Sequence, residues 1–285
     1  MLSIVIPAYN EEAAIGDTIA RINRVIESNG LQDAEVIVVD DCSTDRTAEI
    51  AKSAGAEVVR HPHNAGYGLS LKHGIMTARN DTIVILDADG TYRPESINDL
   101  LIEYTKGFDM VVGARTGEFY RESWFKAPLR SALKLLVEFT AGRTIPDINS
   151  GLRVFSKKEA MKYFDQLCNT FSFTTSLTLA YMQSSKFVSY IPIPYDKRIG
   201  KTKVRLFHDS LRTMQYIVES ILYFNPIKLF LVLCAITMII SGASAAVTLV
   251  FEPVGAVYVL TAGFFVTMIM FGLGMAASIV QKTRK

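Results

Sequence analysis

Residues 82–90 read TIVILDADG, an apolar run that ends in two aspartates, and this stretch points to the fold. A short run rich in β-branched residues and bounded by polar ones is typical of a buried strand. Comparable strands are predicted at residues 3–7, 35–40, 56–60, 82–86 and 109–113. Helical patterns separate them, at residues 12–28, 44–53 (after a cap at Ser43 or Thr44), 68–78 and 94–106. This alternation predicts an α/β fold, in which helices flank a mostly parallel sheet.

Three acidic clusters follow the predicted strands. In parallel sheets ligands bind beyond the carboxyl ends of the strands, where this chain has Glu11, the pair Asp40 and Asp41, and the pair Asp87 and Asp89. Carboxylate oxygens are ligands that Mg²⁺ or Mn²⁺ prefers, and such an ion can bridge a diphosphate. The pattern therefore predicts a metal and nucleotide site. The alternative is ordinary turn chemistry, because Asp and Gly are common after strands.

The remaining nucleotide and metal motifs are weaker. The chain has no G-x-x-x-x-G-K-[ST] sequence and no glycine fingerprint after its first strand, which argues against a P-loop or a dinucleotide-binding turn. Residues 64–68 (NAGYG) are either a loop that lets the backbone approach a ligand closely or a plain turn. His61 and His63 could bind a metal, but no third ligand is evident from the sequence.

The last quarter of the chain is almost free of charge. Of the 285 residues, 49% are hydrophobic and 20% are charged, and between Lys228 and Lys282 the only charge is Glu252. About 20 apolar residues cross the hydrocarbon layer of a bilayer, so transmembrane helices are predicted over about residues 229–251 and 256–280. Their short connection makes them a hairpin. A helix pair buried in a soluble core is the alternative, but such helices seldom stay uncharged on all sides.

The basic residues around the hairpin predict its orientation. Lys228 and the terminal QKTRK flank it, whereas its tip has no Lys or Arg, so the positive-inside rule places the N-terminal part in the cytoplasm. No signal-peptide pattern opens the chain, and three separated cysteines agree with a reducing compartment. The net charge of +2 does not indicate nucleic-acid binding. The predicted domains are residues 1–200, an amphipathic juxtamembrane segment 201–226 and the hairpin 227–285.

Two further stretches, residues 124–142 and 207–221, have amphipathic patterns. In the first, Arg130 and Lys134 belong to a basic series with a spacing of four residues, and apolar residues occupy another face. Helices of this kind can lie in the headgroup layer of a membrane. The alternative is that both helices simply pack on the sheet.

These motifs, in this order, resemble those of a known family. The chain is similar to the family 2 glycosyltransferases, which have a Rossmann-like GT-A fold, in residues 5–12 (VIPAYNEE), 40–41 (DD), 64–68 (NAGYG) and 87–90 (DADG). It resembles more narrowly the dolichyl/polyprenyl-phosphate mannose and glucose synthases, in residues 112–115 (VGAR), 147–153 (DINSGLR) and 197–203 (KRIGKTK). The resemblance covers about residues 3–205. It implies an integral membrane enzyme, in a prokaryote one of the plasma membrane.

The resemblance also implies roles for particular residues. The donor nucleotide sugar would be bound by Pro7, Tyr9, Glu11, Asp40, Asp41, Gly66, Asp87, Ala88, Asp89, Arg198, Lys201 and Lys203. Asp87 and Asp89 would hold Mg²⁺ or Mn²⁺. The acceptor phosphate would be bound by Arg115, Arg130, Lys134, Ser150 and Arg153, and the catalytic residues would be Asp89, Arg115 and Asp147. Asp147 could orient the acceptor or a basic residue, or could only cap the turn that follows it. Gly90 and Thr91 stand where the mannose synthases often have Leu and Gln, which weakens the inference of a mannose donor.

The implied reaction moves a hexose, with inversion, from a donor such as GDP-mannose or UDP-glucose to a membrane polyprenyl or dolichyl phosphate. A phosphate monoester is mostly ionised at neutral pH and needs no strong general base, which fits the absence of an evident catalytic histidine. A processive polysaccharide synthase is one alternative, although two spans are few for a polymer channel. A non-catalytic, membrane-tethered protein that binds nucleotide sugars is another. Assembly into a homo-oligomer stays open.

Overall fold

A computed structural model describes residues 1–31, 33–117, 134–135, 137–139, 141–199, 215, 218–219, 221–223 and 225–283. The chain divides into two compact units, Met1–Tyr216 and Ile217–Lys285, which we describe separately. Arg130, Lys201 and Lys203 lie outside the described residues, as does most of both amphipathic stretches. The roles predicted for them stay predictions.

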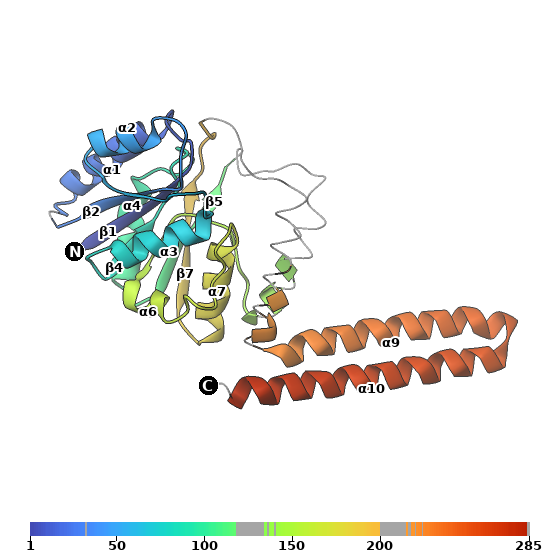
Figure 1. The fold of residues 1–285 in the computed structure, drawn as a ribbon. Coiled ribbons are helices and arrows are strands. Elements are labelled where there is room, and N and C mark those ends of the chain that lie inside the picture. The colour runs from blue at the N-terminus through green and yellow to red at the C-terminus, as the bar shows by residue number, and fades with distance from the viewer. Residues whose placement is uncertain are drawn as a thin grey trace. The chain divides into compact units, whose positions relative to one another are not determined.

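Unit 1 is built on one mixed sheet, as the alternating pattern predicts (Figure 1). Its described strands are β1 (Leu2–Ala8), β2 (Glu35–Asp40), β3 (Glu57–Arg60), β4 (Thr82–Ile85), β5 (Met110–Thr116), β6 (Arg153–Ser156) and β7 (Val188–Pro194). They lie in the order β3-β2-β1-β4-β6-β5-β7, and only β6 is antiparallel to its neighbours β4 and β5 among these strands. The described helices of this unit are α1 (Ile15–Ser28), α2 (Thr47–Ser53), α3 (Tyr67–Thr77), α4 (Ser96–Tyr104), α6 (Lys157–Met161) and α7 (Phe173–Gln183).

The predicted cap of α2 is wrong. The helix begins at Thr47, and its first N–H is accepted by the Asp45 side chain at 3.0 Å rather than by Ser43 or Thr44. Thr44 instead donates its backbone N–H and its hydroxyl to the Asn10 side-chain oxygen, at 2.8 and 3.2 Å. The residues after β2 are therefore used to join two loops at the sheet edge rather than to start a helix.

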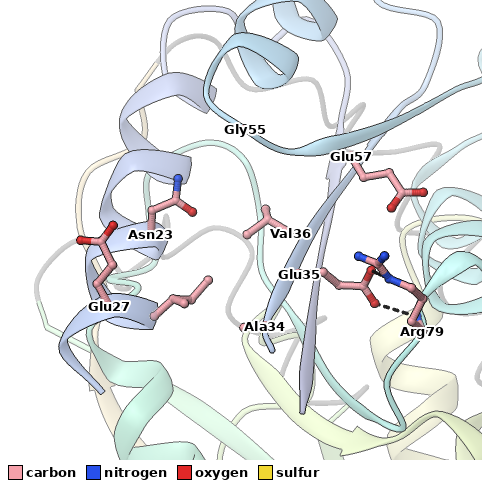
Figure 2. A pocket seen from close by; sticks show the side chains of 9 residues that line it. Asn23, Glu27, Ala34, Glu35, Val36, Gly55, Glu57 and Arg79 are labelled. Atoms are coloured by element: carbon pink, nitrogen blue, oxygen red, sulfur yellow. Dashed lines mark hydrogen bonds and ion pairs between the residues drawn. The ribbon is translucent and has the colours of Figure 1, made fainter. Parts of the chain in front are cut away.

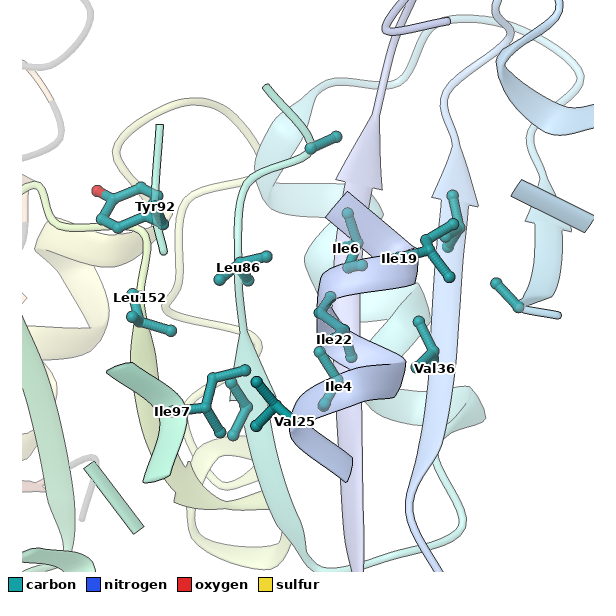
Figure 3. Packing of buried hydrophobic residues seen from close by; sticks show 14 of the residues in the cluster. Ile4, Ile6, Ile19, Ile22, Val25, Val36, Leu86, Tyr92, Ile97 and Leu152 are labelled. Carbon is teal, nitrogen blue, oxygen red and sulfur yellow. The ribbon is translucent and has the colours of Figure 1, made fainter. Parts of the chain in front are cut away.

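The main core lies between the sheet and the helices α1 and α4. Inward side chains of β1 and β2, such as Ile4, Ile6 and Val36, meet Ile19 and Ile22 of α1, and all five are buried (Figure 3). Burial of this kind stabilises the fold by roughly 1.5–3 kcal/mol for each large aliphatic side chain. Because the core fixes β1 and β2 side by side, it also fixes where their carboxyl ends lie.

The opposite face of the sheet is covered by α3, which approaches β1 and β2 very closely. A Cβ atom added to Gly74 would lie 2.3 Å from a methyl group of Val5 and 3.0 Å from one of Val39. No real side chain fits at such distances. A glycine is therefore required at this helix position for packing, although glycine lowers helix propensity.

We expect Gly74→Ala to destabilise unit 1. Overpacking of a core costs about 1–3 kcal/mol, which exceeds the gain in helix propensity of up to about 1 kcal/mol. Denaturant unfolding monitored by circular dichroism would measure the difference. Thr77→Ala, at an exposed position of the same helix, serves as the control and should change the free energy of unfolding by no more than about 0.5 kcal/mol. Equal stability of the two variants would contradict the packing argument.

Unit 2 contains two long apolar helices, α9 (Pro226–Phe251) and α10 (Pro253–Thr283), joined at Glu252. Both are long and apolar enough to cross a membrane, which agrees with the predicted hairpin. The helices meet at small residues: a Cβ on Gly274 would lie 2.6 Å from that of Phe230, and the Ser241 hydroxyl donates to the Val259 carbonyl at 3.0 Å. Most of their large side chains are exposed, as expected for a surface that faces lipid.

Candidate active site

The acidic clusters lie at one edge of the sheet, as their positions after parallel strands predict. Ala8 of β1 is paired with Asp40 of β2, and β4 is paired in parallel with the other side of β1. The segments that follow these strands therefore leave the sheet on the same side. This edge brings together the carboxylates of Glu11, Asp87 and Asp89 with the guanidinium of Arg198.

Asp87 and Asp89 form an acidic pair in which Asp89 is buried and Asp87 is half-buried. Asp87 accepts a hydrogen bond from the Tyr67 hydroxyl at 2.9 Å, and Asp89 accepts from the backbone N–H and hydroxyl of Thr91 at 3.1 and 2.6 Å. Gly151 makes room for Asp87, because a Cβ at this glycine would lie less than 3 Å from the carboxylate. Burial and the negative charge of Asp89 raise the pKa of Asp87 to about 7.

These two carboxylates fit a divalent cation. A cation between them would offset the burial and the mutual repulsion that raise the Asp87 pKa. Among the residues that the structure describes, no third acidic, histidine or cysteine side chain completes a metal cluster with them. Thr91, which stands where the mannose synthases often have Gln, donates its hydroxyl to Asp89.

Arg198 and Ile199, which follow β7, contact Asp89 of the acidic pair. Arg198 contacts Glu11 at 2.7 Å through Nη2 and Asp89 at 3.3 Å through Nη1, and the Ile199 N–H donates to the Asp89 carbonyl at 3.1 Å. The Nε atom of Arg198 is buried and has no hydrogen-bond partner in the described part of the chain. A buried donor without an acceptor is costly. Arg198 is thus equipped to donate to an anionic ligand at the acidic pair.

Arg115 and Asp147 form a bidentate ion pair at the end of β5. Asp147 accepts from Arg115 Nε at 2.7 Å, from its Nη2 at 2.9 Å and from its backbone N–H at 3.1 Å. The guanidinium also lies over the Tyr195 ring, 5.3 Å from its centroid. Burial opposes ionisation of Asp147, but the bonds from Arg115 outweigh it and hold its pKa below the usual range. Asp147 also accepts from the Asn149 N–H at 3.2 Å, so it both aligns Arg115 and caps the turn that follows it. Its catalytic role stays a prediction.

Asp40 and Asp41 hold the loops of the site. Asp40 is fully buried, accepts from the Ser43 N–H at 3.1 Å and lies 3.2 Å from Arg60. Asp41 accepts from the N–H groups of Ala65 and Gly66 at 2.7 and 2.9 Å. Both carboxylates therefore have contacts within the protein, although Oδ2 of Asp40 is buried without a hydrogen-bond partner among the described residues. Contact with a donor nucleoside stays a prediction for both.

His61 is part of a hydrogen-bonded chain rather than a metal cluster. Its Nδ1 lies 2.8 Å from Asp41, and its Nε2 lies 2.8 Å from Nδ1 of His73. His63 is exposed, and the described residues contain no metal cluster around either histidine. Burial and the neighbouring His61 lower the pKa of His73, which favours the neutral ring that such a chain requires. This series of hydrogen bonds holds Asp41 in place, and Asp41 in turn holds the loop of residues 64–68.

The glycines of this loop make room for another segment of the same polypeptide, residues 168–170. A Cβ on Gly68 would lie 2.4 Å from the Cys168 carbonyl, and one on Gly66 would lie 3.1 Å from that of Asn169. Gly66 also has a φ of +97°, which favours glycine. The close approach expected at residues 64–68 is therefore real, but the backbone that approaches there belongs to residues 168–170.

Two residues predicted at the acceptor phosphate have internal roles instead. Arg153 is fully buried, and its guanidinium donates to the carbonyls of Ser150 and Ile148 and to the Thr178 hydroxyl, at 2.6–2.8 Å. The buried Ser150 hydroxyl donates to the Gly113 carbonyl. Both side chains are held inside the protein, because an arginine beneath the sheet edge must satisfy its donors there. Lys134 is half-exposed and lies 3.7 Å from Glu138.

The other residues predicted to bind the donor nucleotide sugar differ in solvent accessibility. Pro7 and Ala88 are buried in the strand ends, so they can contact a ligand only through a small exposed surface. Tyr9, which directly follows β1, is exposed. Tyr67 was not predicted at all, because its contact with Asp87 depends on how α3 packs against the sheet.

A separate pocket of about 330 Å³ lies at the opposite end of β2, lined by Asn23, Ile26, Glu27, Ala34, Glu35, Val36, Gly55, Glu57 and Arg79 (Figure 2). Glu35, its most buried carboxylate, accepts from the Ser3 hydroxyl and from Nε and the backbone N–H of Arg79. Because Glu35 begins β2 and Asp40 ends it, the strand separates this pocket from the acidic edge.

Comparisons with known proteins agree with this arrangement. The family model described as glycosyl transferase family 2 matches residues 3–168. The chain is 31% identical, over 207 residues, to a dolichyl-phosphate hexose transferase of Haloferax volcanii. The aligned region covers 72% of this chain and 87% of that protein. It is 32% identical, over 224 residues, to the low-salt glycan biosynthesis hexosyltransferase Agl6 of the same organism, covering 77% of this chain and 53% of Agl6.

A solved structure shares the fold. Glucosyl-3-phosphoglycerate synthase from Mycobacterium tuberculosis, in complex with Mn²⁺, UDP and phosphoglyceric acid, is 21% identical with a TM-score of 0.64. The match covers 77% of this chain and 78% of that one, and it confirms the predicted GT-A-like fold. The family model alone covers more than half of the chain. The chain belongs to glycosyl transferase family 2.

Proposed function

We propose that this enzyme transfers a hexose from a nucleotide diphosphate sugar to the phosphate of a membrane polyprenyl or dolichyl phosphate. The observation that carries the proposal is the acidic pair of Asp87 and Asp89 beside Arg198, which contacts Asp89 and whose Nε lacks a partner among the described residues. Carboxylates that can hold a cation and an arginine that can donate to oxygens are the groups that a bound diphosphate requires. The hexosyl transfer to dolichyl phosphate in the name of the Haloferax volcanii relative supports the acceptor class.

Each charged group of the site would have a distinct task. Asp87 and Asp89 would hold Mg²⁺ or Mn²⁺, which when bound neutralises the leaving diphosphate. Arg198 would bind the same diphosphate from the other side. Arg115, aligned by Asp147, would hold the acceptor phosphate and offset the repulsion between two anions.

The acceptor oxygen needs no strong base, since a phosphate monoester is mostly ionised near neutral pH. Direct attack on the anomeric carbon from the face opposite the leaving group would invert its configuration. Positioning of the two substrates would then be the main contribution of the protein. The described edge of the sheet fits that task, because Asp147 fixes Arg115 and Thr91 fixes Asp89 through short hydrogen bonds.

The two apolar helices would anchor the enzyme where its acceptor resides. A polyprenyl chain stays in the bilayer and only its phosphate reaches the surface. The basic residues at the ends of the hairpin, Lys228 and the terminal QKTRK, support a cytoplasmic location for the N-terminal unit. Its amphipathic stretches would then face the headgroups.

A panel of labelled nucleotide sugars tests the proposed function. Membranes that contain the enzyme would be incubated with polyprenyl phosphate and each donor in turn, including GDP-mannose, UDP-glucose and UDP-N-acetylhexosamines. We expect label from one donor class to enter the lipid phase, and EDTA to abolish that transfer until Mn²⁺ is restored. Label that enters only polymer, or no label in any lipid, would contradict the proposal.

Removal of the hairpin should affect lipid acceptors selectively. With the chain ended after residue 225, transfer to long-chain polyprenyl phosphate in liposomes should fall at least about tenfold, because the anchor no longer concentrates the enzyme at the membrane. Transfer to a short, water-soluble polyprenyl phosphate analogue should change little, which serves as the internal control. Unchanged transfer in liposomes would show that the hairpin has no such role.

A further inference from the structure

We propose that Tyr67 is a positioning residue for the metal-binding carboxylate of Asp87, and that Phe171 and the buried Lys72 hold Tyr67 in place. This inference rests on the proposed function, because it assigns Asp87 to the metal. It assigns a role at the site to three residues that belong neither to the acidic pair nor to the basic groups described above.

Tyr67 contacts Asp87 directly. It is the first residue of α3, and its hydroxyl donates to Oδ1 of Asp87 at 2.9 Å. On the other side of the carboxylate, Gly151 leaves only enough space for Asp87 itself. These two neighbours restrict the rotation of the Asp87 carboxylate before any ligand binds.

Phe171 packs against the Tyr67 ring. The two ring centroids are 5.4 Å apart with an interplanar angle of 35°, within the range of favourable aromatic contacts. Phe171 is nevertheless 53% exposed. The contact with Tyr67 is the ring contact that Phe171 makes among the described residues.

The segment that carries Phe171 is fastened to α3. The Leu69 N–H donates to the Asn169 carbonyl at 2.9 Å, and Gly68 allows the backbone of residues 168–170 to approach the helix within less than 3 Å of an added Cβ. Phe171 therefore cannot shift relative to Tyr67 unless this segment leaves the first turn of α3.

Lys72 provides a second attachment, one turn further along the same helix. Its ammonium group is buried and donates to the carbonyls of Phe164 and Leu167 and to the side-chain oxygen of Asn169, each at 2.6 Å. Among the described residues it has no carboxylate partner at ion-pair distance. A buried charge without a counter-ion is expensive and persists only where all of its donors are satisfied. Lys72 thus holds three points of the segment before Phe171 against α3.

The contacts form one continuous path from Lys72 through residues 164–171 to Phe171, Tyr67 and Asp87. Groups that orient a metal ligand without touching the metal commonly change metal affinity about 10- to 100-fold when they are removed. We therefore expect effects on metal binding from residues that do not themselves contact the metal.

Titration of the full-length protein with Mn²⁺ alone, followed by EPR of the free ion, tests the inference without any turnover. We expect Tyr67→Phe, which keeps the ring but loses the donor, to weaken Mn²⁺ binding about 10- to 100-fold, and Phe171→Ala to weaken it in the same direction. Phe187→Ala is the matched control, since Phe187 is 61% exposed and has no ring contact within the described residues. Lys72→Met should also weaken Mn²⁺ binding, and Tyr67→Phe keeps the test valid if Lys72→Met does not fold.

The outcomes separate this inference from the proposed function. If Asp89→Asn lowers Mn²⁺ affinity but Tyr67→Phe and Phe171→Ala bind like the wild type, the inference is overturned and the metal site stands. If Asp89→Asn leaves Mn²⁺ affinity unchanged, both are overturned. Weakened binding in Tyr67→Phe and Phe171→Ala, with an unchanged thermal unfolding temperature and a normal Phe187→Ala control, supports the positioning role.

Discussion

Asp89→Asn should lower the rate of hexose transfer by about 10²–10³-fold or more, while the protein still folds. The amide keeps the shape of the side chain, and its oxygen can still accept from the N–H and hydroxyl of Thr91, as the Asp89 carboxylate does. What it loses is the negative charge that would bind the metal and that faces Arg198 at 3.3 Å. Loss of one group that stabilises developing charge has effects of this size. Initial rates with saturating Mn²⁺ and donor would measure it.

The control for this substitution is Asp99→Asn. Asp99 is an exposed residue in the first turn of α4, so the same chemical change there should leave transfer unaltered. The unfolding temperatures of both variants should stay close to that of the wild type. Normal turnover of purified Asp89→Asn would contradict both the metal site and the glycosyltransferase mechanism built on it.

The strand and helix order of the first 116 residues could be predicted from the sequence. The runs at residues 3–7, 35–40 and 82–86 are short, apolar and bounded by polar residues, and each is a strand within one or two residues of the prediction. Such runs are informative because a strand covered on both faces needs apolar residues throughout. The position of the acidic residues followed directly, since parallel strands end at the same edge.

The second half of the sheet could not be predicted in the same way. β6 lies between β4 and β5 and runs antiparallel to both, and no local pattern in RVFS indicates which strands it pairs with. Its first residue, Arg153, explains the error at the acceptor site. An arginine in a motif next to a predicted active site suggests phosphate binding, but pairing of β6 in the sheet interior buries this one completely.

The remaining residues near the site are brought together by long-range packing. Tyr67, Phe171 and Lys72 are separated by up to about a hundred residues in the chain and are brought together only because residues 164–171 pack on α3. The sequence could place glycines at 66 and 68, but it could not tell whether a ligand or the chain itself would occupy the space beside them. Such contacts have no local signature, because they depend on the tertiary fold.

Arg115→Lys should lower kcat/KM for the polyprenyl phosphate acceptor by roughly 10²-fold and should also lower stability. Lysine keeps the positive charge but cannot form the two parallel bonds with which Arg115 holds Asp147. Asp147 is 3% exposed, and complete loss of the partner of a buried carboxylate costs about 3–5 kcal/mol, so the less well bonded lysine should cost part of that. In the wild type, the lowered pKa of Asp147 makes the pair stabilising above the unfolded aspartate pKa of about 3.9, and this contribution is lost as the pH falls below it.

The double variant Arg115→Gln/Asp147→Asn separates the structural from the functional part of this effect. It replaces the ion pair by two neutral amides that can hydrogen-bond to each other, so it should recover much of the stability that Arg115→Gln alone loses, because no unpaired charge remains buried. It should not recover transfer, because no cation remains at the end of β5 to meet the acceptor phosphate. Acceptor titrations at fixed donor, together with denaturant unfolding of the single and double variants, measure both quantities. If transfer returned with stability in the double variant, Arg115 would serve only to neutralise Asp147. If stability returned without transfer, the guanidinium would be acting on the substrate.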